Sequence, residues 1–314
     1  MNSFCRAARL GVVLLALLSG TATAAADGAA VDVRARIRGL LLGAYLGDAL
    51  GGPVEFQEAV KVQALPNPPR RWRDEEIFDA PARAAAAARL RLRPYAPLRP
   101  VSESYGQWGS NCPPGTVTDD SRHKLVLLHA LRAADGADAR PLDVRGLAQA
   151  YLDWPARPVI AENPEFRAQC ADWLEEWQLA ARWVLGERDS ARALPPERMW
   201  QGLPTCCGQM TLPPLAAVFA GRPDDAHRAA WHLAFFDNGF GRDMNAARVA
   251  ALAAALVTPA DPARPRPAWD AVLAALRGTD PYRHRQIRWS QRAVDRWLDF
   301  ALGAAREAEG RPAR

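Results

Sequence analysis

Lysine is nearly absent from this sequence. Lys61 and Lys124 are the two lysines among 40 basic residues, so the net charge of +5 comes almost entirely from arginine. The arginines are spread along the chain and do not cluster with aromatic residues, which argues against a nucleic-acid-binding surface. After the N-terminal segment no apolar run is long enough to cross a membrane. No stretch alternates apolar and polar residues over a useful length, so the sequence predicts an all-α fold.

The N-terminal segment has the pattern of a signal peptide. Two arginines precede residues 10–18 (LGVVLLALL), which are apolar but too short to span a bilayer, and residues 22–24 (ATA) fit a cleavage site. We expect residues 1–26 to be removed and the protein to be periplasmic or secreted. The remaining residues 27–314 are within the range of a single domain, and we expect it to be a monomer.

Four cysteines remain after this cleavage, and their spacing fits no zinc pattern. An oxidising compartment would allow one or two disulfides, whose pairing the sequence leaves open, and buried free thiols are an equal alternative. The adjacent Cys206 and Cys207 are unsuited to pair with each other. The four residues are Cys112, Cys170, Cys206 and Cys207.

Apolar residues at helical spacing predict a series of helices. The first covers residues 34–48 and ends at the glycines and proline that follow, whereas residues 64–115 are expected to be rich in loops. A stripe that includes Trp173 and Trp177 is typical of a buried core. Further helices are predicted over residues 119–135, 142–152, 164–184, 214–220, 224–236, 245–256, 269–276 and 290–306.

Thr118, Asp119 and Asp120 lie where a helical pattern begins, directly after a loop. Two acids in a first helical turn interact favourably with the helix dipole, so a capping role is one interpretation. A hydroxyl and two carboxylates are also hard oxygen ligands of the kind that Mg²⁺ or Mn²⁺ prefers. His123 lies three residues after Asp120, and we expect it on the solvated surface of the helix, with a contact to a metal ligand as the alternative.

Two further acids lie near the end of the first helix. Asp48 falls on its apolar face in the last turn, where the helix dipole disfavours an anion. We expect Asp48 to bind the amides of the adjacent loop, and a nearby cation is the alternative. Glu55 follows directly after the turn, next to Phe56.

Three segments resemble motifs of the ADP-ribosylglycohydrolase family. They are residues 39–56 (GLLLGAYLGDALGGPVEF), residues 115–121 (GTVTDDS) and residues 210–216 (MTLPPLA), and the first two in this order form the specific signal. The resemblance covers roughly residues 35–260. It implies an orthogonal all-α bundle of many helices with Mg²⁺ or Mn²⁺ in a cleft. It also implies hydrolysis of the bond between ADP-ribose and a protein side chain or a small acceptor.

The resemblance assigns roles by position. Thr118, Asp119 and Asp120 would bind metal, Glu55 and Asp119 would be catalytic, and Glu55 would lie at the ribose and position water or substrate. A metal-held water is more acidic, and the ions would also clamp the ribose hydroxyls. The partner would be an ADP-ribosylated protein or an ADP-ribose-like small molecule. Its diphosphate would need backbone amides or arginines that the sequence does not identify.

The second metal motif of the family, Asp-x-Asp-Thr or a related form, departs from its pattern here. In one alignment it is residues 241–246 (GRDMNA), with Asp243 kept as a ligand and Asn245 and Ala246 in place of the second Asp and the Thr. In the other, which we favour on spacing, residues 237–256 match the family's middle helix and the domain is incomplete at its C-terminus. Both predict an incomplete binuclear site, in which one or two ions bind.

Three functional hypotheses follow. The first is an exported, metal-dependent hydrolase that releases ADP-ribose. The second is a catalytically inactive exported protein that binds ADP-ribose or acts as an immunity protein. The third is a hydrolase of another glycoside on the same scaffold.

Overall fold

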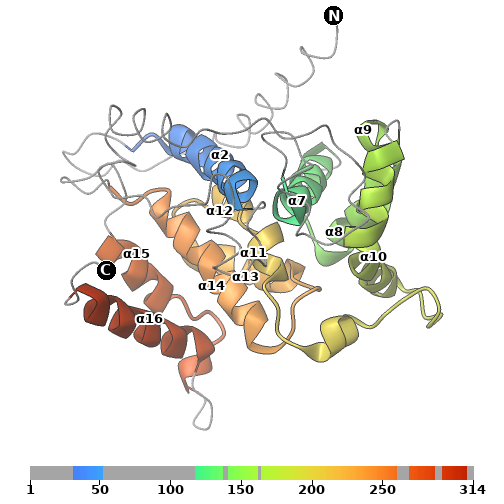
Figure 1. The fold of residues 1–314 in the computed structure, drawn as a ribbon. Helices are drawn as coiled ribbons and strands as arrows, with labels where there is room; N and C mark the ends of the chain where they lie inside the picture. Colours follow the sequence, from blue (N-terminus) through green and yellow to red (C-terminus); the bar gives the residue numbers. More distant parts are fainter. Residues whose placement is uncertain are drawn as a thin grey trace, which may run out of the picture.

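The computed structural model describes residues 31–51, 117–136, 141–161, 164–259, 269–286 and 292–309 (Figure 1). All regular elements in these parts are helices, so the predicted all-α class is confirmed. The longer helices are α2 (Val33–Gly51), α7 (Asp119–Gly136), α8 (Val144–Asp153), α10 (Pro164–Leu185), α13 (Pro223–Leu233), α14 (Gly239–Ala255), α15 (Trp269–Gly278) and α16 (Ala293–Glu309). The short ones are η3 (Trp154–Ala156), α9 (Pro158–Ala161), η4 (Pro196–Gly202), α11 (Cys207–Thr211), α12 (Leu215–Val218) and η5 (His284–Gln286).

Helix α14 lies in the middle of the structure (Figure 1). It packs most extensively against α13 and also contacts α11, α12, α15 and α16, while α7, α8 and α10 form a second packed group. Alanines at positions 246, 247, 250, 253 and 254 are buried, so neighbouring backbones can approach α14 closely. At its far end, Arg36 of α2 donates to the carbonyl oxygens of Ala255, at 3.0 Å, and of Thr258.

Local sequence signals account for several helix ends. Asp143 precedes α8, and its Oδ1 accepts a hydrogen bond from the amide of Gly146 at 2.8 Å, which satisfies one of the unpaired amides of the first turn. Helix α10 ends at Gly186, whose φ of 110° lies in the left-handed region that glycine tolerates. The amide of Glu187 then bonds back to the carbonyl of Arg182 at 2.9 Å, as in a Schellman motif.

The helix α14 begins at Gly239, before its predicted start at Asn245. Its first turn contains two glycines, which normally indicate a break. Gly241 is there for a different reason, because a Cβ on it would lie 2.8 Å from the carbonyl oxygen of Thr205. The helix continues through these glycines because the preceding loop packs directly on its backbone.

Two neighbouring helices are shorter than predicted. The predicted helix over residues 214–220 is confined to α12 (Leu215–Val218), and α13 ends at Leu233 instead of Phe236. After α13 the chain turns into the core, where Phe235 and Phe236 are buried. The apolar residues that extended the predicted helix therefore pack in a turn.

One buried histidine contradicts the sequence-based expectation. His123 is fully buried instead of exposed, and its Nδ1 lies 3.0 Å from the hydroxyl of Tyr151. Its ring also packs on that of Trp177, with the centroids 4.3 Å apart. The predicted core position of Trp177 is confirmed, since its side chain is buried. Within the described ranges no helix is both long and apolar enough to cross a membrane.

Candidate functional site

The end of α2 and the start of α7 are joined by Asp48. Its Oδ1 accepts hydrogen bonds from the Thr118 amide at 3.0 Å and the Thr118 hydroxyl at 2.5 Å, and its Oδ2 accepts from the Ser121 amide at 3.0 Å. The first amides of a helix have no partner within the helix, so an anion there is favourable. We expected Asp48 to bind the amides of its adjacent loop, and that expectation is wrong for the partners described here. They lie 70 and 73 residues later in the chain.

The same contact fixes the position of Thr118. This side chain is 2% exposed, and its Oγ1 also accepts a hydrogen bond from the Asp120 amide at 3.2 Å. Thr118 is thus a conventional helix cap that is itself held by Asp48. The capping interpretation of the Thr-Asp-Asp segment is correct for the threonine.

Asp119 and Asp120 place two carboxylates beside this cap. Burial raises the pKa of Asp119, and the neighbouring charge of Asp120 raises it further, with a smaller contribution from Asp48. Like charges near one another favour a neighbouring cation, and oxygen ligands match Mg²⁺ or Mn²⁺. As metal ligands, Thr118, Asp119 and Asp120 stay a prediction.

A fixed positive charge lies in the next turn of α7. Lys124 is 5% exposed, and its ammonium donates to the carbonyl of Asp120 at 2.9 Å and lies 3.6 Å from the Asp120 carboxylate. Buried lysines are rare unless they are paired. Lys124 therefore offsets part of the negative charge of the acid cluster.

A cavity of about 650 Å³ opens beside these residues. Helix α2 supplies one wall through Gly39, Gly43 and Gly47, and α7 supplies Asp120 and Lys124. Asp48, Gln209 of α11 and Arg248 of α14 complete its polar lining. A Cβ added to any of the three glycines would have no atom of the described residues within 4 Å, so these residues leave this face of α2 open to the cavity. The volume is within the usual range of small-molecule sites.

Asp237 is a buried acid to which the sequence analysis assigned no role. It accepts hydrogen bonds from Thr205 Oγ1 at 3.1 Å, from the Gly208 amide at 3.2 Å and from Asn245 Nδ2 at 2.8 Å. Burial raises its pKa to about 6. A Cβ on Gly208 would lie 2.3 Å from Asp237, so only glycine fits there. No local pattern in the sequence indicates this buried cluster, because Thr205 and Gly208 lie 32 and 29 residues before Asp237.

The thiol of Cys206 lies close enough to both Asp237 and the acids at the start of α7 to be affected by their charges. Burial raises the pKa of Cys206, and the charges of Asp120, Asp237 and Asp119 add to that effect. Cys206 is exposed and Cys207 is buried, and both are free thiols. Cys112 and the side chain of Cys170 lie outside the described residues, so their pairing stays open.

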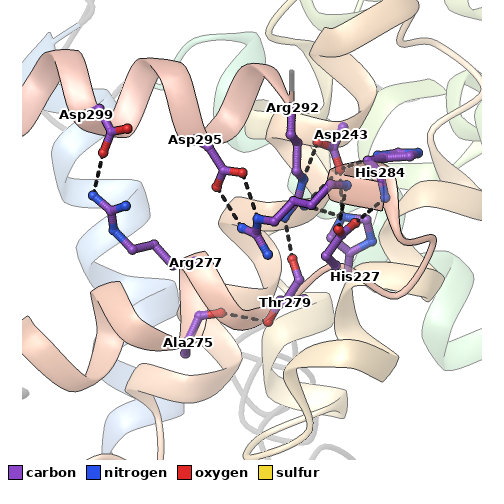
Figure 2. Close-up of polar contacts among 11 residues, drawn as sticks. His227, Asp243, Ala275, Arg277, Thr279, His284, Arg292, Asp295 and Asp299 are labelled. Atoms are coloured by element: carbon purple, nitrogen blue, oxygen red, sulfur yellow. Dashed lines mark hydrogen bonds and ion pairs between the residues drawn. The ribbon is translucent and has the colours of Figure 1, made fainter. Parts of the chain in front are cut away.

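Asp243, the fourth predicted metal ligand, lies in a different cluster (Figure 2). Arg292 donates to its two oxygens, from Nε at 2.7 Å and from Nη2 at 2.9 Å, and His227 Nε2 lies 3.0 Å from Oδ1. Burial opposes ionisation, but the hydrogen bonds from His227 and Arg292 hold the pKa of Asp243 below its usual value. As a metal ligand Asp243 stays a prediction, and its carboxylate would first have to leave Arg292.

Asn245, two residues further along α14, faces Asp237. Its amide nitrogen donates to Asp237 and, at 3.3 Å, to the carbonyl of Thr205. An aspartate at this position would place a second carboxylate against a buried one, so the amide is the group that fits. Glu55 lies outside the described residues. Within those residues no three His, Cys, Asp or Glu side chains form a group that could hold a metal ion.

A family model described as ADP-ribosylglycohydrolase matches residues 29–313. The chain belongs to the ADP-ribosylglycohydrolase family. No curated protein and no solved structure matches it. The resemblance seen in the motifs is confirmed, and the match extends beyond residue 260, where the resemblance was expected to end. The all-α structure agrees with the fold expected for an ADP-ribosylglycohydrolase.

Proposed function

We propose that this protein is an exported, metal-dependent ADP-ribosylglycohydrolase that releases ADP-ribose from a modified protein side chain or a small acceptor. The main observation behind this proposal is that Asp48 hydrogen-bonds to the start of α7. This contact holds Thr118, Asp119 and Asp120 beside an open cavity of about 650 Å³. Family membership and the signal-peptide pattern support the same function.

In this proposal each polar group has a defined task. Thr118, Asp119 and Asp120 hold Mg²⁺ or Mn²⁺, which would supply Lewis acidity at the bond to be cleaved. Asp48 fixes the geometry of these ligands through the Thr118 and Ser121 amides. Glu55 positions the attacking water or the ribose. The glycine wall of α2 admits the substrate close to the helix backbone.

A catalytically inactive ADP-ribose-binding protein is the second candidate. The observation that favours it is the engagement of Asp243 by Arg292 and His227, together with an amide at position 245. With neither residue available as a carboxylate ligand, the first metal motif would act alone. Ligand binding would then persist without turnover.

Release of free ADP-ribose from mono-ADP-ribosylated protein tests the proposal directly. The mature chain is incubated with Mg²⁺ or with chelator, on substrates linked through Arg, through Ser and through Asp or Glu. Release that the chelator removes is expected. Binding of ADP-ribose with no release from any substrate would exclude the hydrolase and favour the inactive binder.

A further inference from the structure

The cavity beside Asp120 contains two cations from different helices. Lys124 comes from α7, and Arg248 comes from α14. The guanidinium of Arg248 donates to Gln209 Oε1 at 2.8 Å, which holds it against the cavity wall. Two positive groups from elements far apart in the sequence therefore converge on one open space.

The acids of the site do not account for both cations. The Lys124 ammonium has three donors, and its neighbours are the carbonyl and the carboxylate of Asp120. Among the described residues no carboxylate lies within ion-pair distance of Arg248, and its recorded partner is the neutral Gln209. Arg248 thus keeps unused donors in the forked arrangement that matches phosphate oxygens.

The shape of the cavity suits a phosphate-bearing ligand of nucleotide size. Gly39, Gly43 and Gly47 leave the α2 wall flat, because no described residue fills the space where their side chains would lie. Leu40 and Leu252 add apolar surface on the same cavity. The lining therefore combines two cations and an apolar wall with the metal-ligand candidates at one end.

We propose that Lys124 and Arg248 form the subsite for the diphosphate of an ADP-ribose-like ligand. The proposal rests on the proposed function for the identity of the ligand. The ribose to be cleaved would lie toward Thr118–Asp120, and the diphosphate would lie one helical turn away along α7. This assigns the recognition of the diphosphate to two side chains that lie outside the motifs shared with the family.

Isothermal titration of the mature chain with ADP-ribose, ADP and adenosine in Mg²⁺ tests the subsite. Arg248→Gln is expected to weaken ADP-ribose and ADP binding about tenfold or more and to leave any adenosine binding unchanged. The affinity of Arg248→Lys for ADP-ribose should fall between those of the wild type and Arg248→Gln, because a point charge replaces the forked guanidinium. Lys124→Met provides a second variant, with a melting curve to confirm folding. Arg228→Gln, an exposed arginine on α13 at 3.8 Å from Asp225, is the matched control for the loss of one charge.

Equal affinity of wild type and Arg248→Gln for ADP-ribose would overturn the subsite. So would an equal loss for adenosine, or no binding of ADP-ribose and ADP by the wild type. The proposed hydrolase can fail independently. If Arg248→Gln weakens the binding of ADP-ribose and ADP but not of adenosine, and the wild type releases no ADP-ribose, the subsite is supported and the hydrolase is contradicted. If the wild type releases ADP-ribose and Arg248→Gln binds it with unchanged affinity, the hydrolase is supported and the subsite is contradicted.

Discussion

The carboxylate of Asp48 binds both the amide and the hydroxyl of Thr118, a residue 70 positions later in the chain. One side chain at the end of α2 therefore sets where α7 begins. Because Thr118, Asp119 and Asp120 are the first residues of α7 or its cap, α2 also sets the position of the candidate metal ligands. Under the proposed function, stability and activity would be coupled at this contact.

Replacing Asp48 by alanine should destabilise the protein by about 2–3 kcal/mol, because several hydrogen bonds to a charged group are lost. Urea unfolding measures the change. Asp32→Ala is the control, since Asp32 accepts one exposed hydrogen bond from Ala35 at 3.0 Å as a local cap of α2. That variant should lose at most about 1 kcal/mol. An equal loss in both variants would contradict the coupling of α2 to α7.

Asp119→Ala should abolish Mg²⁺-dependent release of ADP-ribose while the protein stays folded. The expected loss is about 100-fold or more, because changes one step removed from a metal ligand already cost about 10- to 100-fold. Asp135→Ala, at the opposite end of α7 and exposed, removes the same charge and should leave activity unchanged. Retained turnover in Asp119→Ala would assign this acid to helix capping alone.

Arg292→Met should cost about 3–5 kcal/mol of unfolding free energy, because it leaves Asp243 charged and buried without its main partner. Arg277→Met removes an arginine from the exposed pair with Asp299 in the same region (Figure 2), whose side chains are 45% and 65% exposed. That pair should contribute about 0–1 kcal/mol. If the two variants unfold at the same urea concentration, the Asp243 cluster does not anchor the C-terminal helices.

Asp237 should make the protein less stable as the pH rises. Its pKa is about 6 in the folded protein and near the ordinary value of 3.8 in the unfolded chain. The folded state therefore binds more protons between these values, and the stabilisation present below pH 4 is lost as the pH passes 6. The loss amounts to at most about 3 kcal/mol.

Asp237→Asn should remove this pH dependence. The new amide can donate to Asn245 Oδ1, a buried atom with no hydrogen-bond partner among the described residues. Urea unfolding of both proteins from pH 4 to pH 8 checks the difference. If the difference in unfolding free energy between the variant and the wild type does not grow with pH, the pKa of Asp237 is not raised in the folded protein.

The sequence was sufficient for the parts of the fold that depend on local signals. The helix pattern, the end of α10 at Gly186 and the cap of α7 by Thr118 follow from residues within a few positions. Contacts between distant segments were not predictable in the same way. His123 was expected on the surface because its own helix gives it no buried partner, whereas Tyr151 and Trp177 come from α8 and α10.

The candidate site shows the same division. The Thr-Asp-Asp segment could be found from its residues, and Asp48 was noticed because an anion at a helix C-terminus is unfavourable. Its partners could not be named, since they lie 70 and 73 residues later in the chain. Asp243 was chosen from a motif, but Arg292, 49 residues later, determines what its carboxylate binds.

The link from Arg36 to the end of α14 has a consequence for the order of assembly. Arg36 binds carbonyl oxygens 219 to 222 positions later, so α2 has no docking partner at α14 until most of the chain has been synthesised. Contacts of such long sequence separation form slowly. The contact of Asp48 with α7 needs only 70 intervening positions, whereas the cavity is complete only once α14 has docked against α2.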